Sequence, residues 1–294
     1  MRNSDLLRTL LLGLAFTTAL PGQVDAREII RRAVAADELN WKAARNYTFL
    51  QRVELRWLDA QGKVKSSHVQ TYDVTLQEGT PYRQLVQRED SALCPSEEKA
   101  EHERLAKSIA ERRRETDLKR AKRLSEYDRR PDWQSEAWHE LPEAFEFQLA
   151  GEGEMDGHSV IIIEAVPREG YQPRSRTAKL FRSIKGKFWV DQQDHQIVKV
   201  EAEVIDAISV GFFLVRVAKG SRAILQMTTV GDRVRLPDHL QVFASARLGL
   251  VKVVRFEQST HFSRYGTVPT NARIGYPTES RVLGLYPFAK GTSQ

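Results

Sequence analysis

Hydrophobic and polar residues alternate one by one over much of this chain. The clearest case is residues 186–206, in whose second half small apolar residues and charged residues take turns. A period of two is the repeat of a β-strand with one apolar and one charged face. Two such runs joined by the polar residues 191–196 predict an antiparallel hairpin. Similar runs predict further strands at about 47–58, 64–78, 82–89, 145–149, 158–166, 222–230, 238–248 and 251–263.

Two of the intervening segments have helical periodicity. In residues 27–44 apolar side chains recur every three or four positions, and Asp25 is the expected N-cap, with Glu28 completing a capping box. Residues 95–127 contain no internal Gly or Pro and carry a thin apolar stripe, which predicts one long helix or two broken ones. The basic run at 112–114 is either a patch for an anion or a membrane, or a solvated face paired with nearby glutamates.

The segments between these elements are expected to be irregular. Trp133 and Trp138 fall in what reads as a short linking segment, and residues 151–157 read as a turn. Residues 158–166 are apolar on both faces, which predicts a central, fully covered strand. Residues 266–294 are rich in Pro, Gly, Thr and Ser and are expected to form a loosely packed tail.

These elements predict a mainly β (α+β) fold. We expect one domain over residues 27–265, in which a curved antiparallel sheet forms an unclosed β-barrel. The N-terminal helix and the charged helical insertion, residues 95–130, would serve as lid or plug.

The first 26 residues have the pattern of a cleavable signal peptide. Arg2 and Arg8 precede an apolar run of about 12 residues, too short to cross a bilayer comfortably. Val24-Asp25-Ala26 has the small-x-small form of a cleavage site. No cysteine stands there to form a lipobox, so the mature protein is expected to be periplasmic or secreted.

Composition narrows the possible partners. The chain has 45 basic and 39 acidic residues, a net charge of +6. This excess would assist transient contact with an anionic membrane surface, but it is too dilute to indicate nucleic-acid binding. The single cysteine, Cys94, excludes an internal disulfide and is expected to be an incidental, partly buried thiol.

No motif for catalysis stands out along the chain. The seven histidines lack the spacings of metal ligands, and neither a nucleophile elbow nor a phosphate-binding loop is present. Asp191 and Asp194 are expected to accept backbone N–H groups in a hairpin turn. We therefore expect no enzyme, no catalytic residue, no metal and no cofactor.

A curved sheet with one apolar face can enclose a hydrophobic cavity if the helices fill it only in part. Plain core packing is the alternative for each residue of that face. The apolar run 208–215 would supply a mobile lip with Phe212, Phe213 and Leu214. The residues expected to line the cavity are Phe49, Val53, Leu55, Trp57, Phe145, Phe147, Val198, Val200 and Val204.

One motif indicates a family. Gly186-Lys187-Phe188-Trp189-Val190-Asp191 is followed by a second strand beginning Ile197-Val198-Lys199-Val200, and Glu164-Ala165-Val166-Pro167 precedes it. With the order of elements, this resembles the LolA/LolB-like superfamily over about residues 27–265, nearest to its outer-membrane lipoprotein-sorting-like branch. The resemblance implies an unclosed antiparallel barrel, a helical lid and a hydrophobic cavity for acyl chains. The charged insertion at 95–130 distinguishes this chain from the carrier of the family. The missing lipobox distinguishes it from the membrane-anchored acceptor.

The expected function is a non-enzymatic periplasmic carrier or binding protein, acting as a monomer. Its ligand would be a lipid, an acyl chain or a lipoprotein. One alternative is an envelope sensor or interaction module that binds protein through its sheet edge or its 95–127 helices. Another is a hydrolase whose site is assembled from distant residues.

Overall fold

The strands of this protein form one antiparallel sheet. A computed structural model describes residues 25–128, 132–210, 215–231, 233–249 and 252–267. In this part of the chain the strands are β1 (Tyr47–Leu58), β2 (Val64–Gln77), β3 (Thr80–Arg88), β4 (Ser91–Ala92), β5 (Phe145–Met155), β6 (His158–Pro167), β7 (Ile184–Asp191), β8 (Ile197–Val204), β9 (Ile208–Val210), β10 (Val215–Val217), β11 (Arg222–Val230), β12 (Val234–Leu248) and β13 (Lys252–Thr267).

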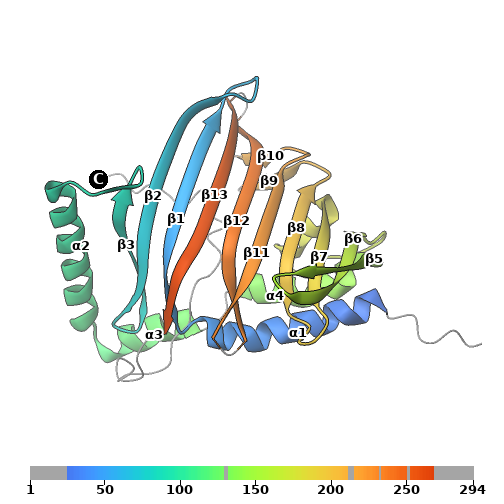
Figure 1. The fold of residues 1–294 in the computed structure, drawn as a ribbon, viewed down its shortest axis with the longest axis horizontal. Helices are drawn as coiled ribbons and strands as arrows, with labels where there is room; N and C mark the ends of the chain where they lie inside the picture. Colours follow the sequence, from blue (N-terminus) through green and yellow to red (C-terminus); the bar gives the residue numbers. More distant parts are fainter. Residues whose placement is uncertain (1–24, 129–131, 211–214, 232, 250–251, 268–294) are drawn as a thin grey trace, which may run out of the picture.

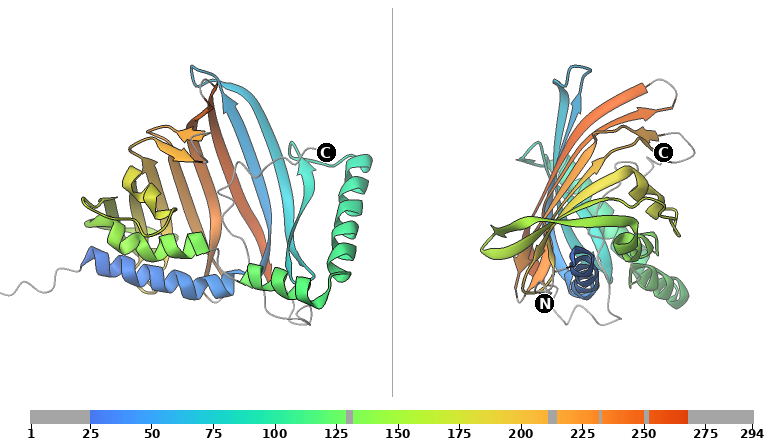
Figure 2. Two further views of the ribbon diagram at one scale, coloured as in Figure 1. Left: turned by 180° about the vertical axis from the view of Figure 1, so that it is seen from behind. Right: turned by 90° about the vertical axis from the view of Figure 1, so that its right-hand side faces the viewer.

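The sheet is open, as its strand order shows. The order is β4-β3-β2-β1-β13-β12-β11-β8-β7-β6-β5, with the short β9–β10 hairpin attached to β12. Strands β4 and β5 therefore form two separate ends that do not pair with each other. The predicted unclosed antiparallel barrel is confirmed, and its strong twist is visible where Figure 2 shows the sheet edge-on.

The helices follow the rim of the sheet (Figures 1 and 2). Helices α1, α3 and α4 run along its lower edge, and α2 stands beside β3. Seen from behind in Figure 2, the middle of the sheet has no described helix over it. The helices are α1 (Ala26–Ala44), α2 (Pro95–Arg113), α3 (Asp117–Asp128), α4 (Asp132–Ala144) and the 3₁₀-helix η1 (Ala178–Ser183).

Helix α1 forms as its sequence predicts. Asp25 is the N-cap, and its side chain accepts a hydrogen bond from the Arg27 backbone N–H at 2.9 Å. The capping box is not formed, because the Glu28 carboxylate pairs with Arg32 at 3.1 Å. A cleavage after Ala26, the position expected from the sequence, would remove this N-cap.

The main hydrophobic core lies between α1, α4 and the β5–β8 end of the sheet. Helix α1 contributes the side chains that its periodicity places on one face. The buried members of this core are Ala26, Ile29, Ile30, Ala33, Val34, Leu141, Ala144, Phe145, Ile163, Ala165, Phe188 and Val190.

Helix α4 replaces the linking segment expected around Trp133 and Trp138. Ala137, Leu141 and Ala144 are buried and lie four and three residues apart, so they form one helical stripe. Pro142, near the end of the helix, hides this periodicity in the sequence.

Strand β5 is longer than predicted. It continues to Met155 through a bulge at Gly151, whose φ of +143° suits glycine, so the expected turn shrinks to Asp156 and Gly157. Strand β6 is correspondingly next to the edge and not central, because β5 adds beyond it. The prediction of a central position from the apolar residues on both faces of β6 is therefore wrong.

The charged insertion forms two helices, α2 and α3. It stands at the β3–β4 end of the sheet, so its part as a lid stays a prediction. Cys94 precedes α2 as predicted, but its side chain is exposed and not partly buried.

Candidate functional site

One face of the sheet carries a continuous cross-strand row of residues that are apolar except at Thr260. Residues directly opposite each other in paired strands point to the same face. Apolar residues from separate strands therefore lie next to one another on the helix-covered side of the sheet. Its members are Ile163, Phe188, Val200, Leu225, Leu240, Thr260 and Val53.

This face has two regions that differ in their cover. The packed half is the β5–β8 region, where Phe145, Phe147, Phe188 and Val200 belong to the core under α1 and α4. The open half is the face of β1, β12 and β13, where the described helices reach only the lower edge, at the Asn40–Arg235 contact between α1 and β12 (Figure 2). In the open half Val53, Leu55 and Trp57 are only half-buried.

Aromatic side chains line the open half. The ring of Phe49 lies 5.7 Å from those of both Phe262 and Tyr265, and Trp57 lies 5.8 Å from Phe256, measured between centroids. These five residues are called the aromatic lane below. Such spacings stabilise pairs of rings beyond the area they bury.

A bulge in β13 places Tyr265 in this lane. Phe262 and Tyr265 are three residues apart and would point to opposite faces of a regular strand. Arg264 adopts a left-handed φ of +52°, which turns Tyr265 onto the same face. The Tyr265 hydroxyl donates to the Pro237 carbonyl, and burial raises the pKa of this phenol.

The predicted cavity residues divide between the two halves. By strand alternation all of them point to the helix-covered face. Phe145, Phe147 and Val200 pack in the main core, and Phe49 belongs to a second cluster with Leu240 and Phe262. Val198 and Val204 are buried as well, whereas Val53, Leu55 and Trp57 are half-buried, as are Phe147 and Val200, which pack against the main core. The proposed lip, Phe212 to Leu214, lies outside the described residues.

Glycine in the Gly186–Asp191 motif is explained by packing. A Cβ at Gly186 would lie 3.2 Å from the Phe188 ring and 3.5 Å from the Glu201 carbonyl oxygen. The missing side chain lets Phe188 fold back over its own strand into the main core. The motif is thus structural, as far as Gly186 and Phe188 are concerned.

Grooves lined by described residues lie elsewhere, and each has charged side chains in its lining. One of about 300 Å³ is lined by α4 and the 168–174 loop, and one of about 330 Å³ by α1 and α4. A third of about 310 Å³ lies on the opposite face of the sheet, around His239 and His261. None of these three is lined by the predicted cavity residues.

The two histidines of the third groove were not expected to meet. Their rings stack at 3.8 Å with planes 14° apart, and a His239 ring nitrogen lies 2.8 Å from the Ser259 hydroxyl. Burial lowers the pKa of His239, and the neighbouring His261 lowers it further. His261 is exposed on this polar face.

Asp191 does more than the turn function predicted for it. Its carboxylate accepts the Gln193 backbone N–H at 2.8 Å, as expected, but it also pairs with Arg235 at 2.5 Å and His158 at 3.0 Å. The Arg235 and Asp191 side chains are 3% and 2% exposed. The Arg235 backbone exchanges hydrogen bonds with the side chain of Asn40, so the ion pair joins the β7–β8 hairpin, β12 and α1.

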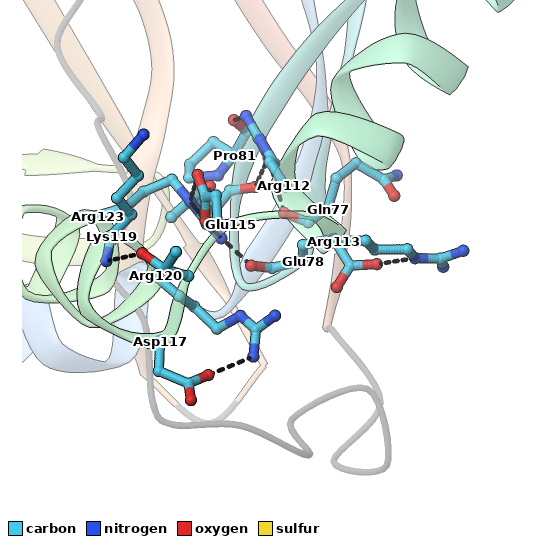
Figure 3. Close-up of polar contacts among 12 residues, drawn as sticks. Gln77, Glu78, Pro81, Arg112, Arg113, Glu115, Asp117, Lys119, Arg120 and Arg123 are labelled. Atoms are coloured by element: carbon cyan, nitrogen blue, oxygen red, sulfur yellow. Dashed lines mark hydrogen bonds and ion pairs between the residues drawn. The ribbon is translucent and has the colours of Figure 1, made fainter.

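Arginines of the insertion bind the β2–β3 turn (Figure 3). Arg112 donates to the carbonyls of Gln77 at 2.7 Å and Thr80 at 3.1 Å. Arg123 donates to the Glu78 carbonyl at 3.0 Å and is paired with Glu115.

Neither of the two hypotheses for the basic run, an anion or membrane patch or a face paired with glutamates, describes all of these arginines. Arg113 pairs with Glu78 at 2.6 Å, in line with the glutamate-paired face, whereas Arg112 satisfies backbone carbonyls. Sequence reasoning missed these bonds because carbonyl groups leave no mark in the residue pattern. An arginine bonded in this way is not available to hold an anion.

The described residues give no sign of a metal centre. They contain no group of three or more His, Cys, Asp or Glu side chains placed to hold an ion. Within the same residues, no helix is long and apolar enough to cross a membrane.

Comparisons with known proteins match the fold only. No family model and no curated protein matches the chain. A putative outer membrane lipoprotein-sorting protein domain from Vibrio parahaemolyticus is similar, with 10% identity, 81% of this chain and 93% of that chain covered, and a TM-score of 0.34. A LolA superfamily protein from Nitrosomonas europaea has 11% identity, 84% and 96% coverage and a TM-score of 0.31. A DUF1329 family protein from Desulfovibrio piger has 12% identity, 83% and 93% coverage and a TM-score of 0.32.

At these identities and TM-scores the matches concern the fold alone, and nothing about a ligand follows from them.

Proposed function

We propose that this protein is a non-enzymatic binding or carrier protein of the periplasm for a lipid or a lipidated partner. The observation that carries the proposal is the half-buried row Val53, Leu55 and Trp57, which lies outside the main core formed with α1 and α4. An apolar strip flanked by aromatic rings suits a hydrocarbon chain.

The accessible part of the open half can cover a segment of an acyl chain. From Val53 to Trp57 the strand advances about 13 Å at roughly 3.3 Å per residue. An acyl chain of about 14 methylenes gains roughly 11 kcal/mol on leaving water, at about 0.8 kcal/mol each. A protein that carries such a chain through water must cover it, and the half-buried row Val53, Leu55 and Trp57 is the surface proposed to do so.

Native mass spectrometry and lipid extraction of the purified protein test this proposal first. A brominated fatty acid gives the position, because bromine quenches the fluorescence of a tryptophan it touches. We expect quenching to fall sharply in Trp57→Phe. Absence of co-purifying lipid together with absence of quenching in the wild type would overturn the proposal.

A matched pair of variants tests the face. Leu55→Glu places a carboxylate on the open half, whereas Leu50→Glu places one on the opposite face of the same strand. Loss of acyl binding is expected in Leu55→Glu alone, with circular dichroism confirming that both variants fold. Equal binding in the two variants would contradict a role for this face.

An envelope sensor or interaction module is the second candidate. Helix α2 favours it, because Glu101 is its one buried residue and the rest of the helix is at least partly accessible. If the protein is an interaction module, replacing residues 95–128 by a short linker is expected to abolish cross-linking to the partner in the envelope. The same replacement is expected to leave acyl binding unchanged.

A further inference from the structure

The two ends of the sheet are treated differently. At one end α2 packs beside β3, and Arg88 pairs with Glu97 at 2.9 Å across the contact. At the other end β5 is the terminal strand, and in the described chain no strand pairs with its outer side (Figure 1). A free edge exposes backbone N–H and C=O groups that another extended chain can pair with.

Strand β5 is long and accessible. It has 11 residues, and all residues from Gln148 to Glu154 are exposed. Leu149 is 46% exposed, and Gly153 has no side chain to shield the backbone. Helices α1 and α4 contribute only near its start, where Phe145 and Phe147 enter the main core.

The charges on this edge are of one sign and lack internal partners. Glu146, Glu152 and Glu154 are exposed, and none forms an ion pair with any residue that the structure describes. On the neighbouring strand, by contrast, Glu164 is paired with Lys187 at 3.0 Å. The unpaired carboxylates give the edge a negative charge within a protein of net charge +6.

We propose that the outer edge of β5 binds an extended basic segment of another protein by strand addition. The backbone of the guest would supply the affinity, and Lys or Arg side chains on one face of the guest would pair with Glu152 and Glu154, which share a face of β5. A second copy of β5 is disfavoured, because its carboxylates would meet carboxylates. This inference is independent of the lipid proposal, and it assigns a surface to the interaction-module alternative.

A synthetic 11-residue peptide of alternating Lys and Val, as long as β5, tests the inference with the full-length protein. Fluorescence anisotropy is expected to show binding that weakens with salt, and hydrogen exchange should slow at residues 145–155. The Glu-Val counterpart should not bind. The Lys-Val peptide with alternate amides N-methylated keeps its charge but loses backbone donors, and its affinity should fall by about tenfold or more.

Variants place the site. Glu152→Lys with Glu154→Lys should abolish binding of the Lys-Val peptide, whereas Glu98→Lys with Glu111→Lys, an equal charge change on α2, should not. Three results would each overturn the proposal: no binding of the Lys-Val peptide, equal binding of its N-methylated form, or equal effects of the two double variants. Equal binding of the N-methylated peptide would mean that the peptide is held by charge attraction alone, without backbone hydrogen bonds to β5. Acyl binding should be unchanged in all of these variants. A negative result in the peptide experiment would therefore overturn strand addition without affecting the lipid proposal.

Discussion

The packed half and the open half of the apolar face have the same sequence pattern but different cover. Both are built from strands in which most residues on the helix-covered face are apolar, although Gln51, Gln258 and Thr260 interrupt this pattern in the open half. In the packed half these residues meet α1 and α4 and become core, whereas in the open half they meet mainly one another. The difference teaches that a one-sided strand predicts an apolar face but not what covers it.

The difference also has an energetic side. In the packed half Phe145, Phe188 and Val190 contribute stability because they are buried, whereas Val53, Leu55 and Trp57 retain accessible surface that a ligand would cover. Substitutions should therefore separate the two halves, with stability lost in one and binding lost in the other.

The largest effect is expected where a buried ion pair ties the packed half to the rest of the sheet. Asp191→Asn leaves the buried Arg235 guanidinium with only the more distant carboxylate of Asp194, at 3.7 Å, which should lower the free energy of unfolding by about 3–5 kcal/mol. Urea denaturation measures this loss. Asp191→Asn with Arg235→Met should recover part of it, and simple additivity of the two substitutions would contradict a direct pair.

Truncation of one aromatic residue in each half sharpens the comparison. Phe188→Ala removes a side chain that is 4% exposed in the main core, so a loss of about 3–5 kcal/mol is expected. Trp57→Ala removes a half-buried ring and should cost about 1–2 kcal/mol, since it buries less apolar area. Equal losses in thermal or urea unfolding would mean that both halves are ordinary core.

The arginine contacts at the β2–β3 turn should have a smaller effect. Arg112→Met keeps the length of the side chain but removes its hydrogen bonds to the Gln77 and Thr80 carbonyls, so a loss of about 1–3 kcal/mol is expected. Hydrogen exchange should then rise at residues 77–81 and in α2. Arg114→Met is the control, because Arg114 is exposed and takes no part in these bonds.

Acid should weaken the packed half through Glu140. Burial alone would raise the pKa of this carboxyl, but hydrogen bonds from Arg174 N, Tyr171 Oη and Ser175 N outweigh it and hold the pKa below its usual range. The stabilisation is present above the unfolded pKa of about 4.3 and is lost as pH falls through the lower folded value. Unfolding midpoints between about pH 5 and 3 should fall more steeply in the wild type than in Glu140→Gln.

The smallest effect is expected at the stacked histidines behind the open half. His239 should titrate below the usual imidazole value, and His261→Ala should raise its pKa because one neighbouring positive charge is removed. NMR titration of the ring protons measures both values. An unchanged His239 pKa in the variant would show that burial alone sets it.

Local patterns were sufficient for the elements with a strict repeat. The N-cap at Asp25, strand β1 and the β7–β8 hairpin all appear where periodicity placed them. Helix α4 was missed because Pro142 interrupts its stripe, and the end of β5 was missed because Gly151 breaks the alternation. Interruptions of this kind hide an element that the surrounding packing still enforces.

Contacts between distant residues were out of reach. Asp191 and Arg235 are 44 positions apart, and Arg112 binds carbonyl groups that every residue possesses. His239 and His261 meet only because β12 and β13 pair in one register. None of these pairs leaves a periodic trace in the sequence.

The sequence by itself determined that the protein is a one-sided antiparallel sheet with an amphipathic N-terminal helix, because alternation and helical spacing are local properties. Tertiary structure alone decided which half of that face is core, which edge α2 covers and where β5 stays open. These outcomes depend on where each helix docks, and docking depends on the register and twist of the whole sheet.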